Sequence, residues 1–164
     1  MSRHAYQTRI DIRSDARSRL IVLLNQELVD ALDLGLQLKH AHWNVKGPQF
    51  ISLHELFDDL AEELEEHIDE MAERLVELGG VATGTLQGVA AGSRLVAYPT
   101  ESRGGREHCT ALALGISTLG GTAREAIDVA AASGDADTAD LFTGVSRALD
   151  KMLWKIEAHL QADS

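Results

Sequence analysis

Cysteine and long apolar runs are scarce in this chain of 164 residues, and each scarcity excludes a class of protein. Cys109 is the only cysteine, so an intrachain disulfide and a structural zinc site built from several thiolates are both excluded. No apolar run approaches the roughly 18 residues that a membrane helix needs, so we expect no membrane segment. Residues 1–13 lack the apolar stretch of a secretory signal, which favours a cytoplasmic location.

Basic side chains are also few: 15 lysines and arginines stand against 26 aspartates and glutamates, a net charge of −11. Such a chain is a poor nucleic-acid binder through its general surface and attracts cations instead. Solubility alone explains the same charge, so both interpretations stay open at this point.

Four long segments have helical periodicity, and the two prolines, Pro48 and Pro99, lie in connections between them. We expect a cap at Ser14 for the first helix and a capping box formed by Ser52 and Glu55 for the second, which should stop at Gly79. The expected helical ranges are 15–44, 53–78, 103–132 and from 137 onward.

The connection over residues 81–100 is about twenty residues long, with short helical turns expected over 86–90. Two helices, a long crossover and two more helices are typical of a ferritin-like four-helix bundle. The sequence therefore predicts an all-α domain over residues 15–162, preceded by a short tail over residues 1–14.

The second helix carries two pairs of candidate metal ligands, His54 with Asp58 and Asp69 with Glu73. Each pair has i, i+4 spacing, and eleven residues separate Asp58 from Asp69, so all four side chains project from one side of the helix. Eleven helical residues rise roughly 16 Å, which no single metal site spans. A second copy, antiparallel across a two-fold axis, would place each pair opposite the other, which predicts a site between subunits.

This ligand face lies beside the apolar stripe of the helix and also carries Ala61, Ala72 and Val76, as expected of a packed interface. Carboxylates with a few imidazoles suit ferrous iron, with zinc and manganese as competitors. The alternative is a solvated acidic face, because this helix is rich in glutamate and some i, i+4 pairs arise by chance.

The remaining histidines have weaker signals. His42 falls on the apolar stripe of the first helix, where an ordinary core histidine is the alternative to a ligand. His40 lies about 200° around the helix from His42 and should not share its role. His67 is off the ligand face, and three more histidines have no evident partner: His4, His108 and His159.

Several motifs closely resemble the Dps family, the DNA-binding proteins from starved cells, also called mini-ferritins. The resemblance extends from about Tyr6 to Leu160 and is most specific between His42 and Gly80. The motifs are His42-Trp43-Asn44 with Gly47, Leu53-His54-Glu55, Phe57-Asp58, Asp69 to Arg74, Leu78-Gly79-Gly80, Tyr98-Pro99, Asp137 to Asp140 and Leu149-Asp150-Lys151.

The resemblance implies a homo-dodecameric shell built from two-fold dimers, with ferroxidase sites at the two-fold interfaces. It implies iron ligands at His42, His54 and Asp58 of one subunit and at Asp69 and Glu73 of its partner. Lys39 and Trp43 match positions near that site. In this family ferrous iron is oxidised, usually by hydrogen peroxide and otherwise by oxygen, and stored as a ferric mineral, which protects DNA.

Acidic residues near the start of the last helix resemble those that line three-fold iron pores in the family, which favours a pore role for Asp137 and Asp140. Helix capping is the alternative, and we expect Asp135 to be either a cap or a loop residue. The lysine-rich tail through which some relatives bind DNA is missing, although residues 1–19 have a net charge of +3. Direct DNA binding and nucleoid association therefore stay open, as does a DNA-compacting or structural cage whose metal sites are vestigial.

Overall fold

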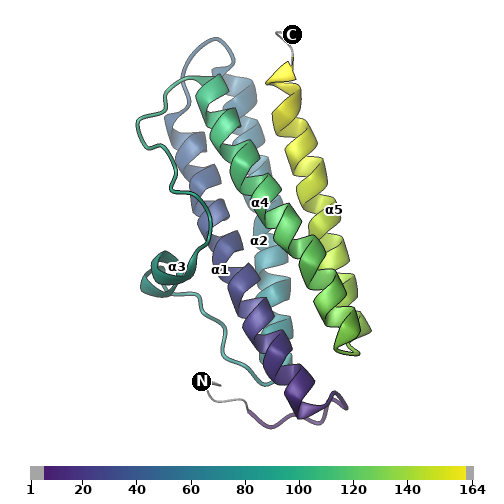
Figure 1. Cartoon of the computed structure of the whole chain (residues 1–164). Helices are drawn as coiled ribbons and strands as arrows, with labels where there is room; N and C mark the ends of the chain where they lie inside the picture. Colours follow the sequence, from purple (N-terminus) through teal and green to yellow (C-terminus); the bar gives the residue numbers. More distant parts are fainter. Residues whose placement is uncertain (1–5, 162–164) are drawn as a thin grey trace.

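The computed structural model describes residues 6–161, which form four long helices and one short helix (Figure 1). Their bounds are α1 Ser14–Asn44, α2 Phe50–Glu77, α3 Leu86–Gly92, α4 Gly105–Ala132 and α5 Ala136–Ala158. Within these residues there is no strand, only an isolated bridge between Lys46 and Gly104. The predicted all-α class, the four long helices and the short helix in the crossover are confirmed. No helix in the described range has the length and apolarity to cross a membrane.

Two helical hairpins make up the bundle, α1 with α2 and α4 with α5 (Figure 1). The crossover carries α3 outside α1 and brings the chain back to the start of α4, at the end of the bundle where α1 meets α2. Residues 1–5 of the expected tail and 162–164 at the chain end lie outside the described residues.

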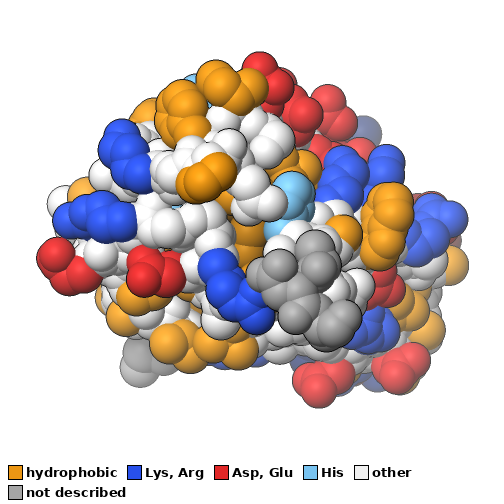
Figure 2. Space-filling model, turned by 90° about the horizontal axis from the view of Figure 1, so that it is seen from above, with side chains coloured by type: hydrophobic (Ala, Val, Ile, Leu, Met, Phe, Trp, Pro, Cys, Tyr) orange, Lys and Arg blue, Asp and Glu red, His pale blue; other side chains and the backbone are white. Residues whose placement is uncertain are grey.

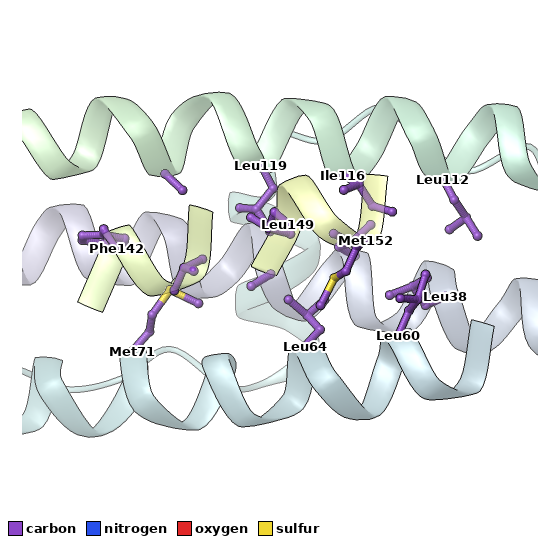
Figure 3. Packing of buried hydrophobic residues seen from close by; sticks show 14 of the residues in the cluster. Leu38, Leu60, Leu64, Met71, Leu112, Ile116, Leu119, Phe142, Leu149 and Met152 are labelled. Carbon is purple, nitrogen blue, oxygen red and sulfur yellow. The ribbon is translucent and has the colours of Figure 1, made fainter. Parts of the chain in front are cut away.

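The core lies along the axis between the hairpins, where the apolar stripes of the long helices meet (Figure 3). The stripe predicted for α2 is buried except at Ile68, which is half-buried. Figure 3 shows Leu60, Leu64 and Met71 of α2 pointing towards side chains of α4 and α5. Because this stripe fixes the rotation of α2 about its axis, it directs the neighbouring ligand face away from the core.

Both predicted helix caps are wrong. Helix α1 already includes Ser14, and Arg13 precedes it without a side-chain cap. Helix α2 begins at Phe50, so Ser52 lies inside its first turn, where its hydroxyl donates to the Gln49 carbonyl. A turn at Gly47, with φ of 110°, folds the chain back early enough to start α2 three residues before the expected position.

The predicted stop after α2 is confirmed at Gly79, which has φ of 94°. Its carbonyl accepts from the Tyr6 backbone amide at 2.6 Å, and a Cβ at this glycine would lie 2.3 Å from the Tyr6 carbonyl oxygen. The N-terminal segment therefore packs directly on the end of α2, at a position where only glycine fits without strain.

Buried acids on α1 anchor the crossover. Glu27 and Asp30 are 2% and 1% exposed, and both accept from the guanidinium of Arg94 at 2.7 Å. Glu27 also accepts from the Thr122 hydroxyl of α4 at 2.7 Å. The crossover is therefore fixed to two helices by one polar cluster in which two buried carboxylates share one guanidinium.

Candidate metal centre

His42 and His54 lie against each other where the end of α1 meets the start of α2. Their rings stack with centroids 3.8 Å apart and 18° between the planes. The His42 Nδ1–H donates to the His54 carbonyl at 2.7 Å, and the His54 Nδ1–H donates to the His42 carbonyl at 2.8 Å. A carbonyl can only accept, so each Nδ1 must hold the proton. Nε2 of each ring is therefore the nitrogen left for a metal, as in metal sites where a carbonyl orients the histidine.

Asp58 lies one turn after His54 and is paired with the Lys39 ammonium of α1. Its Oδ1 is also 4.0 Å from His42 Nδ1. The hydrogen bond from Lys39 lowers the pKa of Asp58, and this outweighs the opposing effect of partial burial. The carboxylate is therefore ionised at neutral pH. We name His42, His54 and Asp58 the histidine group.

Asp69 and Glu73 are exposed on the same helix, about four turns beyond His54. Within residues 6–161 neither carboxylate has a hydrogen bond or an ion pair. We name these two residues the carboxylate group. Across the same described range, no three His, Cys, Asp or Glu side chains gather closely enough to hold a metal ion. The structure thus places His42 next to His54 and Asp58 without forming a closed metal site, and leaves Asp69 and Glu73 apart from them.

Apolar side chains border both groups. Trp43 and Val76 are 64% and 54% exposed, and the Phe50 ring lies 5.1 Å from that of His54. Ala61, between the two groups, and Ala72, next to Glu73, are half-buried. Exposed apolar side chains around candidate ligands are typical of a surface that another protein covers.

At the start of α5, Asp135 is the helix cap, one of the two roles expected from the sequence. Its side chain accepts from the Thr138 amide at 3.1 Å and is 2% exposed. The sequence did not predict its second partner, Arg74 of α2, which reaches both carboxylate oxygens at 2.9 and 3.0 Å. Asp137 and Asp140 are exposed, and Asp137 lies 4.0 Å from Arg74. Their pore role remains a prediction.

His40, Tyr98 and His108 form a cluster that the sequence did not reveal. The Tyr98 hydroxyl lies 2.6 Å from His108 Nδ1, and the Tyr98 ring is edge-on to His40 with centroids 5.1 Å apart. The expected separation of His40 from His42 is confirmed, because His40 faces the crossover. The one signal for this cluster in the sequence is that His108 occupies a position on the apolar stripe of α4, where the structure buries it.

Comparisons with known proteins agree with this arrangement. A family model described as the ferritin-like domain matches residues 21–164. Over 159 residues the chain is 46% identical to the DNA protection during starvation protein of Agrobacterium fabrum, covering 97% of this chain and 98% of that protein. The chain belongs to the Dps family.

Solved Dps structures share the whole fold. Dps from Mycobacterium smegmatis has a TM-score of 0.91 at 31% identity, with 96% of each chain covered. Dps from Vibrio cholerae, described as a member of a broad superfamily of ferritin-like diiron-carboxylate proteins, has a TM-score of 0.89 at 26% identity. That comparison covers 97% of this chain and 100% of the Vibrio chain. The predicted ferritin-like bundle and the resemblance to Dps are thus confirmed.

Proposed function

We propose that this Dps chain forms a homo-dodecameric shell that oxidises ferrous iron with hydrogen peroxide and stores the ferric product. One observation carries the proposal. The histidine group presents two Nε2 lone pairs beside an ionised carboxylate, while the carboxylate group on the same helix has no partner in residues 6–161. Each group is an incomplete ligand set, and together they suit ferrous iron, with zinc or manganese as competitors.

A two-fold axis near the middle of α2 would complete both sets. His54 and Glu73, like Asp58 and Asp69, are equally spaced about the midpoint of residues 63 and 64. An antiparallel partner helix therefore sets the histidine group of one subunit opposite the carboxylate group of the other, twice for each dimer. The exposed Val76 and Trp43 would become buried in the same contact.

The chemistry requires little from the protein beyond positioning. Two ferrous ions each give one electron to peroxide, its O–O bond breaks, and both oxygens end in ferric oxyhydroxide. Two waters supply the remaining oxygens, and four protons are released. The negative charge of this chain, −11 for each subunit, favours the entry of cations, and Asp137 and Asp140 are the candidate pore residues. Consumption of peroxide and iron together would protect DNA in the cytoplasm.

Direct DNA binding is not part of this proposal. Figure 2 shows the end of the bundle seen from above, where basic side chains alternate with acidic and apolar ones. A phosphate backbone is bound by a continuous basic surface. A gel-shift assay at several salt concentrations decides the matter, and a complex that weakens steeply with salt would add DNA binding to the function.

Mixed shells test the site between subunits. Asp58→Ala and Glu73→Ala should each lower the initial rate of ferric absorbance, after addition of ferrous iron and peroxide, by at least about tenfold. When the two variants are coexpressed, each mixed dimer pairs one intact histidine group with one intact carboxylate group. Random pairing then restores about one quarter of the sites, and the rate should recover to that extent.

Coexpression of Asp58→Ala with His54→Ala is the matched control, because both changes damage the histidine group and no mixed dimer contains an intact site. The proposal is wrong if the Asp58→Ala and Glu73→Ala mixture, assembled into shells, recovers no more activity than this control. It is also wrong if the native protein elutes as a monomer, or if Asp58→Ala oxidises iron as fast as the unaltered chain.

A further inference from the structure

The cluster of His40, Tyr98 and His108 lies where α1, the crossover and the start of α4 meet. His108 is fully buried, and its Nε2 has no hydrogen-bond partner in the described residues. The buried Nε2 of His40 has none there either. Within the described residues the His108 side chain has one hydrogen-bond partner, the Tyr98 hydroxyl, at 2.6 Å from Nδ1. This buried imidazole therefore has one satisfied and one unsatisfied nitrogen, and an unsatisfied buried polar group needs an explanation.

The protonation states in the Tyr98–His108 pair follow from burial. Burial raises the pKa of Tyr98, so the phenol keeps its proton at neutral pH. Burial, and next the neighbouring His40, lower the pKa of His108, so its ring is neutral. We therefore assign the hydrogen bond as Tyr98 O–H donating to the lone pair of His108 Nδ1. The phenol thus has a base already in place for its proton.

Two ring contacts connect the pair with residues that neighbour candidate ligands in the chain. The His108 ring lies 6.3 Å from that of Phe57, the residue next to Asp58. Tyr98 contacts His40, which is two residues before His42 on α1. On its other side Tyr98 lines a cavity of about 760 Å³, whose walls include Val96, Pro99 and Leu114. A small oxidant can therefore approach the phenol from the cavity.

We propose that Tyr98 and His108 form a redox pair that quenches one-electron oxidants produced when peroxide meets ferrous iron. A hydroxyl radical takes one electron from Tyr98 and becomes hydroxide. In the same step the phenolic O–H bond breaks, its proton joins His108 Nδ1, and a neutral phenoxyl radical remains. A further ferrous ion then returns the electron and becomes ferric, and the proton moves back to the phenol oxygen. This activity relies on the proposed function for its oxidant and its reductant.

The other oxidisable aromatic residues lack this arrangement. Tyr6, Trp43 and Trp154 are 67%, 64% and 66% exposed, and within residues 6–161 none has a hydrogen bond from its side chain to a base. Loss of a proton accompanies the oxidation of a phenol at neutral pH, so a positioned base lowers the barrier to that step. Tyr98 is therefore the expected site of the protein radical.

Electron paramagnetic resonance of assembled shells, frozen within milliseconds of mixing ferrous iron with peroxide, tests the proposal. A tyrosyl radical should form in the unaltered chain and in Tyr6→Phe, the matched control, because the chain has only two tyrosines. The signal should be lost in Tyr98→Phe. His108→Gln should form the radical about a hundredfold more slowly, the lower end of what a positioned base contributes. If His108→Gln does not fold, a deuterium coupling of the native radical after exchange into heavy water reports the proton on His108.

An iron-free measurement separates this proposal from the proposed function. Azide radical, made by pulse radiolysis, oxidises aromatic side chains without metal or peroxide, and Tyr98 should still carry the radical in Asp58→Ala. Tyr98→Phe should oxidise ferrous iron as fast as the unaltered chain, yet accumulate more oxidised methionine and tryptophan. A tyrosyl radical of undiminished amplitude in Tyr98→Phe in both measurements, or one that disappears only in Tyr6→Phe, overturns the redox pair whatever the outcome for iron oxidation.

Discussion

At the start of α2, His54 and Asp58 are each held by a neighbour on α1, whereas about four turns later Asp69 and Glu73 extend without a partner in the described chain. The difference separates two tasks of a metal site. Imidazole rings must be oriented, and the exchanged carbonyl bonds do this before any metal arrives. Carboxylates supply charge and can rotate to meet a metal, so only the helix carrying them needs to be fixed. Folding of the subunit orients the histidine group, whereas the carboxylate group would find its metal only when subunits assemble.

The largest expected effect comes from removing an ion pair that holds α2, the helix that carries the carboxylate group, against the start of α5. Asp135→Ala leaves the guanidinium of Arg74, the residue after Glu73, without the buried carboxylate whose two oxygens it reaches. Breaking such a pair should lower the free energy of unfolding by about 3 kcal/mol, measured by urea denaturation. Asp137→Ala is the control, because that carboxylate is 88% exposed and 4.0 Å from Arg74, and it should change stability little. Equal losses in the two variants would contradict this role of the pair.

The Arg74–Asp135 pair also predicts that the free energy of unfolding depends on pH. Burial acts to raise the pKa of Asp135, but hydrogen bonds from Thr138 and Arg74 outweigh it and lower the pKa below the ordinary 3.8. Its contribution to stability is therefore complete above pH 3.8 and is lost as the pH falls through the lower, folded value. Urea titrations at decreasing pH should show a smaller loss of stability in Asp135→Asn than in the unaltered chain. Identical slopes would refute the assignment.

One substitution in the histidine group and one in the carboxylate group compare the two groups directly. His42→Ala removes one carbonyl bond and the ring stacked on His54, so it should cost about 1–2 kcal/mol of stability and weaken ferrous iron binding about 10- to 100-fold. Glu73→Gln should weaken iron binding to a similar extent while changing the free energy of unfolding by less than about 0.5 kcal/mol. Calorimetry of the metal-free shells and anaerobic iron titration measure the two quantities. A stability loss in Glu73→Gln as large as that in His42→Ala would remove the distinction.

Lys39→Met should have the smallest effect. Its ammonium pairs with Asp58, and both side chains are about one-third exposed. Without the ammonium, the pKa of Asp58 should rise towards its ordinary value, which a carboxyl NMR titration follows. Removal of a positive charge should also tighten ferrous iron binding by a factor of about three at low salt, and less at high salt. Lys46→Met, outside the group, provides the comparison, and weaker binding in Lys39→Met would mean that the lysine orients the carboxylate.

Much of this architecture could be predicted because it depends on periodicity. The stripe of α2 and the i, i+4 pairs follow from one helix and 3.6 residues per turn, and the stop at Gly79 follows from local chemistry. The caps at Ser14 and Ser52 failed because the turn at Gly47 and the path of the N-terminal segment set the helix starts, and capping preference is weaker than either.

Contacts between distant segments were beyond the sequence. The pairs Arg74–Asp135 and Tyr98–His108 join side chains that no spacing rule relates, because the crossover and the α4–α5 hairpin must be in place first. The exchanged carbonyl bonds of His42 and His54 were likewise hidden. The residues were identifiable as ligand candidates, but the direction of each ring depends on how α1 and α2 meet.

Glu27 has a consequence for the order of folding. Its two oxygens accept from Arg94, 67 residues later, and from Thr122, 95 residues later. Both loops must close before either bond can form, and loop closure is costly in entropy before its contacts repay it. We therefore expect this carboxylate to find its partners after the rate-limiting step. Glu27→Gln should then accelerate unfolding while leaving the refolding rate almost unchanged, so this single side chain would govern how long a folded subunit lasts rather than how quickly it forms.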